Sequence, residues 1–262
     1  MIESIFLILL IFLMGFFGFF SKSLTRSGVV AAVLVGFSVF IGFGEAGLFL
    51  LGIFFASSSI WSKYKSTFKT KMEEKLAKGA TRDWRQVFAN GGTAAIFGII
   101  DYFDPAPIWM LAFCIAIASA NSDTWASEIG SLSKKDPIFI RTFKRIEKGT
   151  SGAVSPLGSM AALSGALLIA LSAFWLFDLD IFTSIFIFVF GYFGNVIDTF
   201  IGAFYQQTYI CQCCGIETER KKHCQKPTVR IKGIAFIDND MVNFLSGLMA
   251  VITALLFFQL FV

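Results

Sequence analysis

Residues 181–205 read IFTSIFIFVFGYFGNVIDTFIGAFY. This stretch holds one charged side chain, Asp198, and it is long enough to cross the hydrocarbon core of a bilayer, which takes roughly 20 apolar residues of helix. Of all 262 residues, 56% are hydrophobic and 15% are charged, whereas a soluble domain has about 25% charged residues. This composition excludes a disordered chain, a fibrous repeat and a disulfide-stapled secreted module. It indicates a polytopic membrane protein.

Similar apolar stretches flank residues 181–205 on both sides. We therefore predict an all-α, polytopic integral membrane bundle of about eight transmembrane helices, with a range of roughly 6–8, in a single domain over residues 1–262. Glu45 and nearby glycines separate the second and third stretches, which favours a tight turn over one long helix. The candidate spans are about Ile2–Phe20, Gly28–Phe43, Ala46–Trp61, Val87–Phe103, Pro107–Ser122, Ala153–Phe177, Ile181–Tyr205 and Met241–Val262.

Basic residues alternate between the connections of these spans. All 22 Lys and Arg residues fall in the connections Ser21–Ser27, Ser62–Gln86, Asp123–Gly152 and Gln206–Asp240. Since basic loops stay in the cytoplasm, we predict cytosolic loops at about 62–86, 123–152 and 206–240 and both termini outside, in the cell membrane if the organism is prokaryotic. In the loop 62–86, alternating Lys and Glu suit an amphipathic cytosolic helix, and the alternative is a solvated connector. The positive surplus would attract a lipid headgroup or a nucleotide, and no nucleic-acid partner is expected.

A polar cluster, Asn121–Gly130, stands at the cytosolic end of the fifth candidate span. If the helix continues through it, Asn121, Thr124 and Glu128 share one face, with Asp123 beside them. Acidic groups at membrane depth are costly, so their positions point to function. Mg²⁺ binds one or two carboxylates together with water and substrate phosphates, and this cluster would suit it. The alternative is a helix end whose polar side chains are only solvated.

Gly194, Asp198 and Gly202 lie at four-residue spacing on one stripe of the seventh span. Glycines in a membrane helix let another backbone come close, so Asp198 should point into the bundle toward a partner. Asn90, within the apolar fourth span, also needs a partner. Asp240 is either a ligand or the N-cap of the last helix, where Asp is favoured.

The segment Glu147–Gly158 combines a lysine, glycines and hydroxyl side chains at the start of the sixth span. Glycines let backbone N–H groups approach an anion, and a helix N-terminus adds the positive end of its dipole. The segment is not the P-loop motif, so its spacing alone leaves two interpretations open. One is an anion site, and the other is a capped helix start with a small-residue packing face.

Four cysteines (Cys211, Cys213, Cys214 and Cys224) and the single histidine gather in the predicted loop 206–240. Cys211-x-x-Cys214, followed by His223-Cys224, resembles a zinc clip, although its spacing is not that of a standard finger. Disulfides are disfavoured in a reducing cytosol, which leaves a structural Zn²⁺ site as one interpretation of these four residues. Cys114, alone in a span, is interpreted as a packing residue.

In chain order, the polar motifs are Arg82-x-x-x-Gln86-Val87 to Asn90-Gly91, Asn121–Gly130, Lys148–Ser155, Asp198-Thr199-x-x-Gly202-Ala203, Cys211–Cys224 and Asp238-Asn239-Asp240-x-Val242-Asn243. In this order and spacing they resemble the family called domain of unknown function 92, which includes transmembrane protein 19. Plant and cyanobacterial members include phytyl-phosphate kinase, and the family is similar to phytol kinase, dolichol kinase and other CTP-dependent lipid kinases. The resemblance implies phosphoryl transfer from CTP or another nucleoside triphosphate to a prenyl alcohol or prenyl phosphate.

We therefore predict a Mg²⁺- and nucleotide-dependent kinase at the cytosolic face of the bilayer, with a prenyl-type lipid and a nucleotide as its partners. Asp123, Glu128 and Asp198 are assigned to Mg²⁺ binding or acceptor activation. Substrate and nucleotide binding is assigned to Asn90, Asn121, Lys148, Gly149, Thr150, Gly152, Ser155, Asp240 and Asn243. The alternative is an ion- or proton-coupled transporter that uses the same acids. A third class is an assembly protein whose polar clusters only hold helices together.

Overall fold

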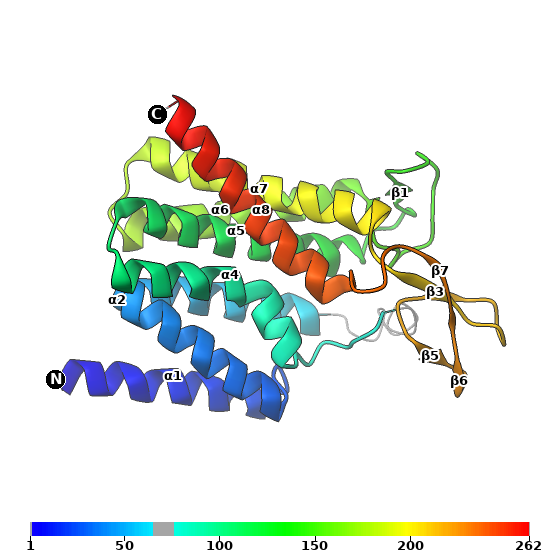
Figure 1. Ribbon diagram of the computed structural model, residues 1–262, viewed down its shortest axis with the longest axis horizontal. Helices are drawn as coiled ribbons and strands as arrows, with labels where there is room; N and C mark the ends of the chain where they lie inside the picture. The colour runs from blue at the N-terminus through cyan, green and yellow to red at the C-terminus, as the bar shows by residue number, and fades with distance from the viewer. Residues whose placement is uncertain (1, 65–75, 262) are drawn as a thin grey trace.

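The computed structural model describes residues 2–64 and 76–261, without the side chains of residues 2–6 and 261. Over these residues the chain is mostly helical, and the helices run side by side as one elongated bundle (Figure 1). The helices are α1 (Ile2–Phe20), α2 (Arg26–Lys63), α4 (Trp84–Phe103), α5 (Pro107–Gly130), α6 (Pro156–Leu176), α7 (Ile181–Phe204) and α8 (Asn239–Phe261). The amphipathic helix expected in the loop 62–86 falls largely outside the described residues.

Helix α2 is two antiparallel arms joined at Gly44, whose φ of 60° and ψ of −149° are not helical. A straight helix of 38 residues would be about 57 Å long. Yet Lys63, at the C-terminal end of α2, contacts the carbonyl of Ser21, just before its N-terminal end. The chain therefore reverses at Gly44, where glycine tolerates the left-handed φ, as Figure 1 shows for the blue and light-blue arms of α2.

Four of the described helices are long and apolar enough to cross a membrane: Arg26–Lys63, Pro156–Leu176, Ile181–Phe204 and Asn239–Leu260. Leu7–Phe20 forms a shorter apolar helix. Helices α4 and α5 are less apolar, because they carry polar side chains such as Asn90 and Glu128. The structure thus has a mainly helical fold suited to a bilayer, but the expected eight spans are not confirmed.

Helix α5 forms the centre of the bundle and contacts α2, α4, α6, α7 and α8. Its segment 111–119 is buried along every side. Small residues allow this close packing, because a Cβ on Gly194 of α7 would lie 2.6 Å from the Cβ of Ser119. The neighbouring Gly191 packs in the same way against Ala118. The glycines of α7 thereby bring its backbone directly against α5.

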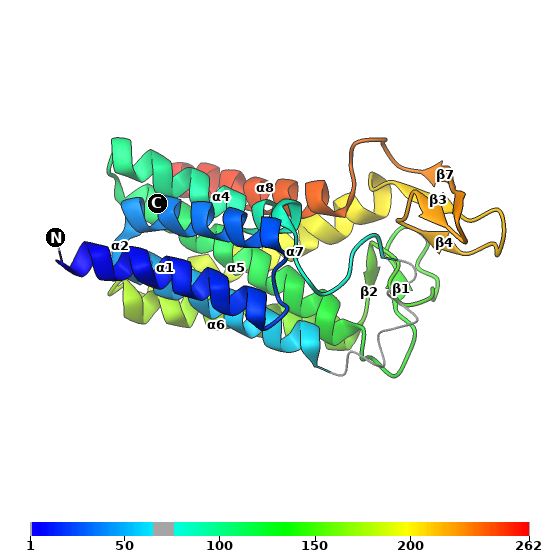
Figure 2. The same ribbon diagram turned by 90° about the horizontal axis from the view of Figure 1, so that it is seen from below.

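Short strands depart from the all-α expectation. They are β1 (Ile138–Phe139), β2 (Ala153–Val154), β3 (Thr208–Ile210), β4 (Glu217–Thr218), β5 (Lys222–His223), β6 (Lys226–Pro227) and β7 (Val229–Lys232). They form three small antiparallel sheets, β1-β2, β4-β3-β7 and β5-β6. Figure 2 shows them together at one end of the bundle. Antiparallel pairing satisfies the backbone groups of loops that leave the helices, which explains why these segments are not simple coil.

The basic connections meet at the strand-bearing end, and both chain termini lie at the opposite end (Figure 1). Thr25 donates its backbone N–H to the carbonyl of Arg82, and Arg220 Nε donates to the carbonyl of Leu76. The loop expected to start at Asp123 starts later, because α5 stays helical through Gly130. The backbone hydrogen bonds of α5 continue to Gly130 although the side chains in this part of the helix are polar.

Candidate functional site

A cavity of about 1070 Å³ opens at the strand-bearing end of the bundle. Helices α4, α5, α7 and α8 line it together with the segments 76–82, 148–155 and 219–222. Most of the side chains predicted to act in catalysis or binding meet here: Asn90, Asp123, Glu128, Lys148, Gly149, Thr150, Gly152, Ser155, Asp198, Asp240 and Asn243. These residues come from five separated stretches of sequence and share one space.

Asp123 of α5 and Asp198 of α7 face each other across this cavity. Their carboxyl groups lie within hydrogen-bonding reach of each other. Ser246 Oγ of α8 donates to Asp198 Oδ2 over 3.1 Å, and the amide of Asn243 donates to the same oxygen over 3.2 Å. The contact of Gly194 with Ser119, one turn deeper, brings the two helices close enough for the acids to meet. Two carboxylates at this distance repel each other unless a proton or a cation lies between them.

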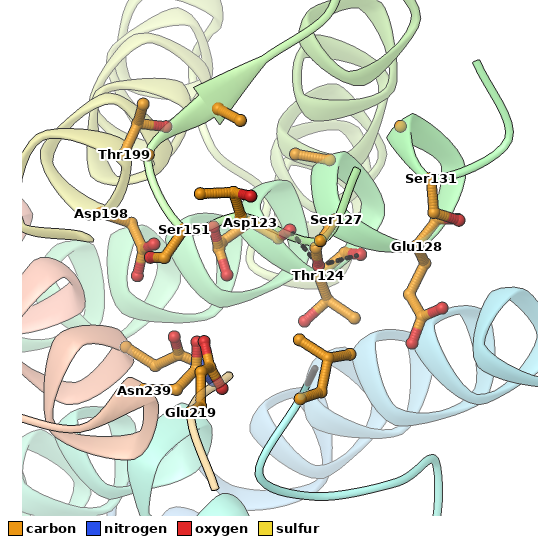
Figure 3. Close-up of a pocket in the computed structure, with 18 of the residues that line it drawn as sticks. Asp123, Thr124, Ser127, Glu128, Ser131, Ser151, Asp198, Thr199, Glu219 and Asn239 are labelled. Atoms are coloured by element: carbon orange, nitrogen blue, oxygen red, sulfur yellow. Dashed lines mark hydrogen bonds between the residues drawn. The ribbon is translucent and has the colours of Figure 1, made fainter. Parts of the chain in front are cut away.

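Glu219 is a third acid of this group, and it is not among the residues selected from the sequence. Figure 3 shows Asp123, Asp198 and Glu219 around one space. Gln206 Nε2 donates to Glu219 Oε1 over 2.6 Å, and the backbone N–H of Ala77 donates to Oε2 over 3.3 Å. Burial raises the pKa of Glu219 to about 7, outweighing these hydrogen bonds. Glu219 can therefore gain or lose a proton near neutral pH.

Glu128 lines the same cavity but lies on the other side of Thr124 from Asp123 (Figure 3). Its carboxylate accepts a hydrogen bond from Ser62 Oγ of α2 over 2.7 Å. Burial lowers the pKa of Arg82. The negative charge of Glu128 acts in the opposite direction but is the smaller effect. Glu128 thus joins α5 to α2, and it lies apart from the pair formed by Asp123 and Asp198.

The segment 148–155 forms a tight loop against α7. Gly149 and Gly152 have φ values of 80° and 84°, in the left-handed region that favours glycine. A Cβ on Gly152 would lie 2.5 Å from the Cα of Ala203, so this glycine allows the loop to touch the helix. Ser155 Oγ accepts from the N–H of Gly158 and caps α6, whose N-terminus borders the cavity. The loop is therefore both a helix cap and part of the cavity wall.

Gln206 connects the loop 148–155 to Glu219 through two hydrogen bonds of its side chain. Its Oε1 accepts from Ser151 Oγ over 2.6 Å, while its Nε2 donates to Glu219. Gln206 is 1% exposed, so both bonds are shielded from water. Lys148 contacts the carbonyl of Ser133, which holds its ammonium group at the cavity wall.

Asp240 does not cap α8. Asp238 has that place, because Asp238 Oδ1 accepts from the N–H of Met241 over 3.1 Å. Asp240 instead pairs with Lys78 over 2.5 Å and with Arg85 over 3.6 Å. The cavity is rich in cations at this side, and its basic lining residues are Lys78, Arg82, Arg85, Lys148, Arg220, Lys221 and Lys222. These charges face the acids across the same space.

Asn121 is not part of the cavity lining, contrary to its predicted binding role. Its side chain is 0% exposed. Its Oδ1 accepts from Ser57 and Ser58 of α2, and its Nδ2 donates to the carbonyl of Gly165 in α6 over 2.8 Å. Asn121 therefore joins three helices in the interior, and every polar atom of its amide has a partner.

The four predicted zinc ligands lie together beside the cavity mouth. The ligand atoms of Cys211, Cys214, His223 and Cys224 are all within 4.8 Å of one another. The thiol of Cys211 is buried, and backbone N–H groups of Cys214 and Cys213 lower its pKa to about 6. This part of the structure could hold a metal ion that is distinct from the group around Asp123.

Comparison with known proteins identifies relatives along almost the whole chain. The model of the family described as integral membrane protein DUF92 matches residues 9–251. Protein PGR of Arabidopsis thaliana is 31% identical, over 94% of this chain and 92% of that protein. Uncharacterized membrane protein MJ0933 of Methanocaldococcus jannaschii is 34% identical, over 71% of this chain and 76% of that protein. Protein VTE6, chloroplastic, of Arabidopsis thaliana is 28% identical, over 62% of this chain and 50% of that protein. No solved structure matches the chain.

Proposed function

This chain belongs to the family of integral membrane proteins called DUF92, and we propose that it is a kinase for a prenyl alcohol or prenyl phosphate. The reaction would transfer the terminal phosphoryl group of CTP or another nucleoside triphosphate. For a prenyl phosphate, an acceptor phosphate oxygen attacks the γ-phosphorus. The bond to the β-phosphate oxygen breaks, and the nucleoside diphosphate leaves with that electron pair. The resemblance of the polar motifs to those of a family that includes phytyl-phosphate kinase supports the proposal.

One observation carries the proposal: the Asp123–Asp198 pair and the loop 148–155 line the same cavity. Phosphoryl transfer is mainly a matter of positioning and of neutralising phosphate charge, so a site needs anion-binding groups beside a cation site. The loop supplies a lysine, glycine backbone at the cavity wall and a helix N-terminus, which suit phosphates. The carboxyl pair supplies hard oxygen ligands, which suit Mg²⁺.

The acids fit Mg²⁺ because Asp123 and Asp198 approach closely and would otherwise repel each other. These two side chains would hold the ion, with Glu219 as a further oxygen donor. Bound Mg²⁺ would neutralise charge on the phosphate oxygens of the nucleotide. For an alcohol acceptor, whichever of these carboxylates is not bound to the ion would accept the hydroxyl proton. Glu128 has a different role in this proposal, holding Arg82 at the opposite wall.

The edge of the cavity suits an acceptor that has a polar head and an apolar tail. Val196 and Phe200 of α7 line the cavity, and they are also 41% and 51% exposed on the surface of the bundle. Because Asp198 lies on the same helix, a lipid tail could pack along these side chains while its head reaches the acids. A soluble substrate would not need such an apolar border.

The membrane arrangement in this proposal has the strand-bearing end in the cytosol, where nucleotide is available. The two arms of α2 would count as two spans, which gives about eight spans with both termini outside. The concentration of Lys and Arg at the strand-bearing end supports this orientation, since basic loops remain cytosolic.

The test uses purified full-length protein in detergent, with radiolabelled nucleoside triphosphates and a panel of prenyl alcohols and monophosphates. The proposal expects label in the lipid product that depends on Mg²⁺. Paired acids also fit an ion- or proton-coupled transporter, and the same preparation separates the two. Transport in proteoliposomes that needs a gradient but no nucleotide, with no labelled lipid in the detergent assay, would reject the kinase.

A further inference from the structure

The strands after α7 bring three thiols and one imidazole to a single point. Cys211 follows β3, and Cys214 ends a tight turn in which the N–H of Gly215 donates to the Cys211 carbonyl over 2.8 Å. Gly215 has a φ of 73°, which glycine accepts without strain. The turn thereby brings the sulfurs of Cys211 and Cys214 to within 4.8 Å of each other.

The other two side chains come from the hairpin of β5 and β6. Cys224 and Gln225 form its two-residue turn, with φ values of 48° and 60°. Both residues are in the left-handed region, which is costly for a side chain other than glycine or asparagine. This turn places His223 and Cys224 beside Cys214. A bond from these side chains to a shared ion would stabilise a turn that its own residues disfavour.

The distances among Cys214, His223 and Cys224 are close to those around a tetrahedral ion, and Cys211 Sγ lies within 4.8 Å of the other three ligand atoms. The Sγ atoms of Cys214 and Cys224 are 3.8 Å apart, and His223 Nδ1 lies 3.4 Å and 3.3 Å from these two sulfurs. For Zn²⁺, with Zn–S of about 2.3 Å and Zn–N of about 2.0–2.1 Å, tetrahedral geometry requires about 3.8 Å between sulfurs and about 3.6 Å between sulfur and nitrogen. The cysteines are not joined by disulfides, so all three thiols are available.

We infer that Cys211, Cys214, His223 and Cys224 bind one structural Zn²⁺ ion. Four protein ligands complete the tetrahedral coordination, which is typical of structural zinc and leaves no position for a substrate. The ion links β3 to the β5–β6 hairpin, and the residues between these ligands include Glu219 and Arg220. The bonds of Glu219 to Ala77 and of Arg220 to Leu76 then hold this segment against the cavity mouth. Zinc binding itself does not depend on the proposed kinase activity.

The experiment measures zinc in full-length protein, purified in detergent without a polyhistidine tag and under reducing conditions. Elemental analysis should find about one zinc per chain. The variants Cys214→Ser and Cys224→Ser should lose most of it. Cys213→Ser is the matched control, because Cys213 is exposed in the same loop but is not part of the cluster, and this variant should keep the zinc.

A second pair of variants keeps the inference falsifiable if loss of a thiol prevents folding. His223→Cys retains four ligands and should retain zinc, whereas His223→Ala should lose it. Replacement by Co²⁺ should give the visible spectrum of a tetrahedral thiolate site in wild type and in Cys213→Ser. Chelation should speed hydrogen exchange at least about ten-fold in residues 208–232 and leave α5 and α7 unchanged. Wild-type protein without zinc, or equal zinc in Cys213→Ser and Cys214→Ser, would overturn the inference.

Discussion

Replacement of Asp198 by asparagine should stabilise the metal-free protein while removing its activity. Asp198 and Asp123 interact directly, and Asp198 also accepts from Ser246. Asparagine has nearly the same shape, retains an oxygen for Ser246 and adds an amide that can donate to Asp123. The substitution therefore removes a repulsion between two carboxyl groups without breaking the contacts that hold α7 against α8.

The size of the gain follows from the separation of the two groups. Two unit charges about 4 Å apart repel by about 4 kcal/mol at an effective dielectric constant of about 20. Water in the cavity and a shared proton reduce this, so we expect Asp198→Asn to raise the free energy of unfolding by about 1–3 kcal/mol. For a chain of this size, that corresponds to a rise in Tm of roughly 2–10 °C. Mg²⁺ should stabilise wild type more than the variant, because the variant has lost one ligand.

The assay is thermal unfolding followed by tryptophan fluorescence in detergent, with and without Mg²⁺, alongside the phosphoryl-transfer rate. Asp180→Asn is the matched control, since Asp180 caps the other end of α7 and asparagine caps equally well. It should change neither property by much. Asp198→Asn should lose at least about a thousand-fold in rate, because several kcal/mol of transition-state stabilisation depend on the ion. A less stable Asp198→Asn variant that retained activity within about ten-fold would refute the reasoning.

Further predictions concern packing, proton binding, nucleotide affinity and topology. Gly194→Ala should destabilise the protein by about 1–3 kcal/mol, because its Cβ would overlap Ser119; an unchanged Tm would contradict the packing. Glu219 has a pKa of about 7 against a usual value of 4.5, so the folded state binds its proton more tightly than the unfolded state. Stability should fall by up to about 3 kcal/mol as pH rises from about 4.5 to about 7, and Glu219→Gln should flatten this part of the profile. Lys148→Ala should weaken nucleotide binding about ten-fold in a titration, since it removes one charged contact, and an unchanged affinity would exclude Lys148 from the phosphate site. An alkaline phosphatase fused after the last residue should be active outside the cell, and activity confined to the cytosol would reverse the proposed orientation.

Much of the fold could be predicted because the bilayer restricts what a sequence can do. Apolar length and the position of every Lys and Arg indicated the helices and the end at which the basic loops gather. Glycine near Glu45 indicated the reversal that the structure places at Gly44. The strands could not be predicted, because segments of two to four residues such as β4 are too short to show an alternating pattern. Their pairing depends on partners far along the chain, such as β3 and β7.

The site was predictable where spacing on one helix decides which way a side chain points. Gly194 and Gly202 lie on the same stripe as Asp198, and this stripe packs against α5 and the loop 148–155. Asn121 was misassigned because a helical face does not reveal whether its neighbour is a cavity or another helix. Glu219 was missed because its partners, Gln206 and Ala77, come from segments that only the folded chain brings together.

The transfer of label from the γ-phosphate of a nucleoside triphosphate to a prenyl acceptor, by wild type and by Asp123→Asn over a Mg²⁺ titration, tests the central claim most directly. Both proteins are assayed in detergent at a temperature well below the Tm of each, so that folding does not limit the comparison. The proposal predicts transfer by wild type that disappears on chelation of Mg²⁺, and at least about a thousand-fold less transfer by Asp123→Asn. Wild-type transfer that persists without Mg²⁺, or an Asp123→Asn rate within about ten-fold of wild type, would contradict it.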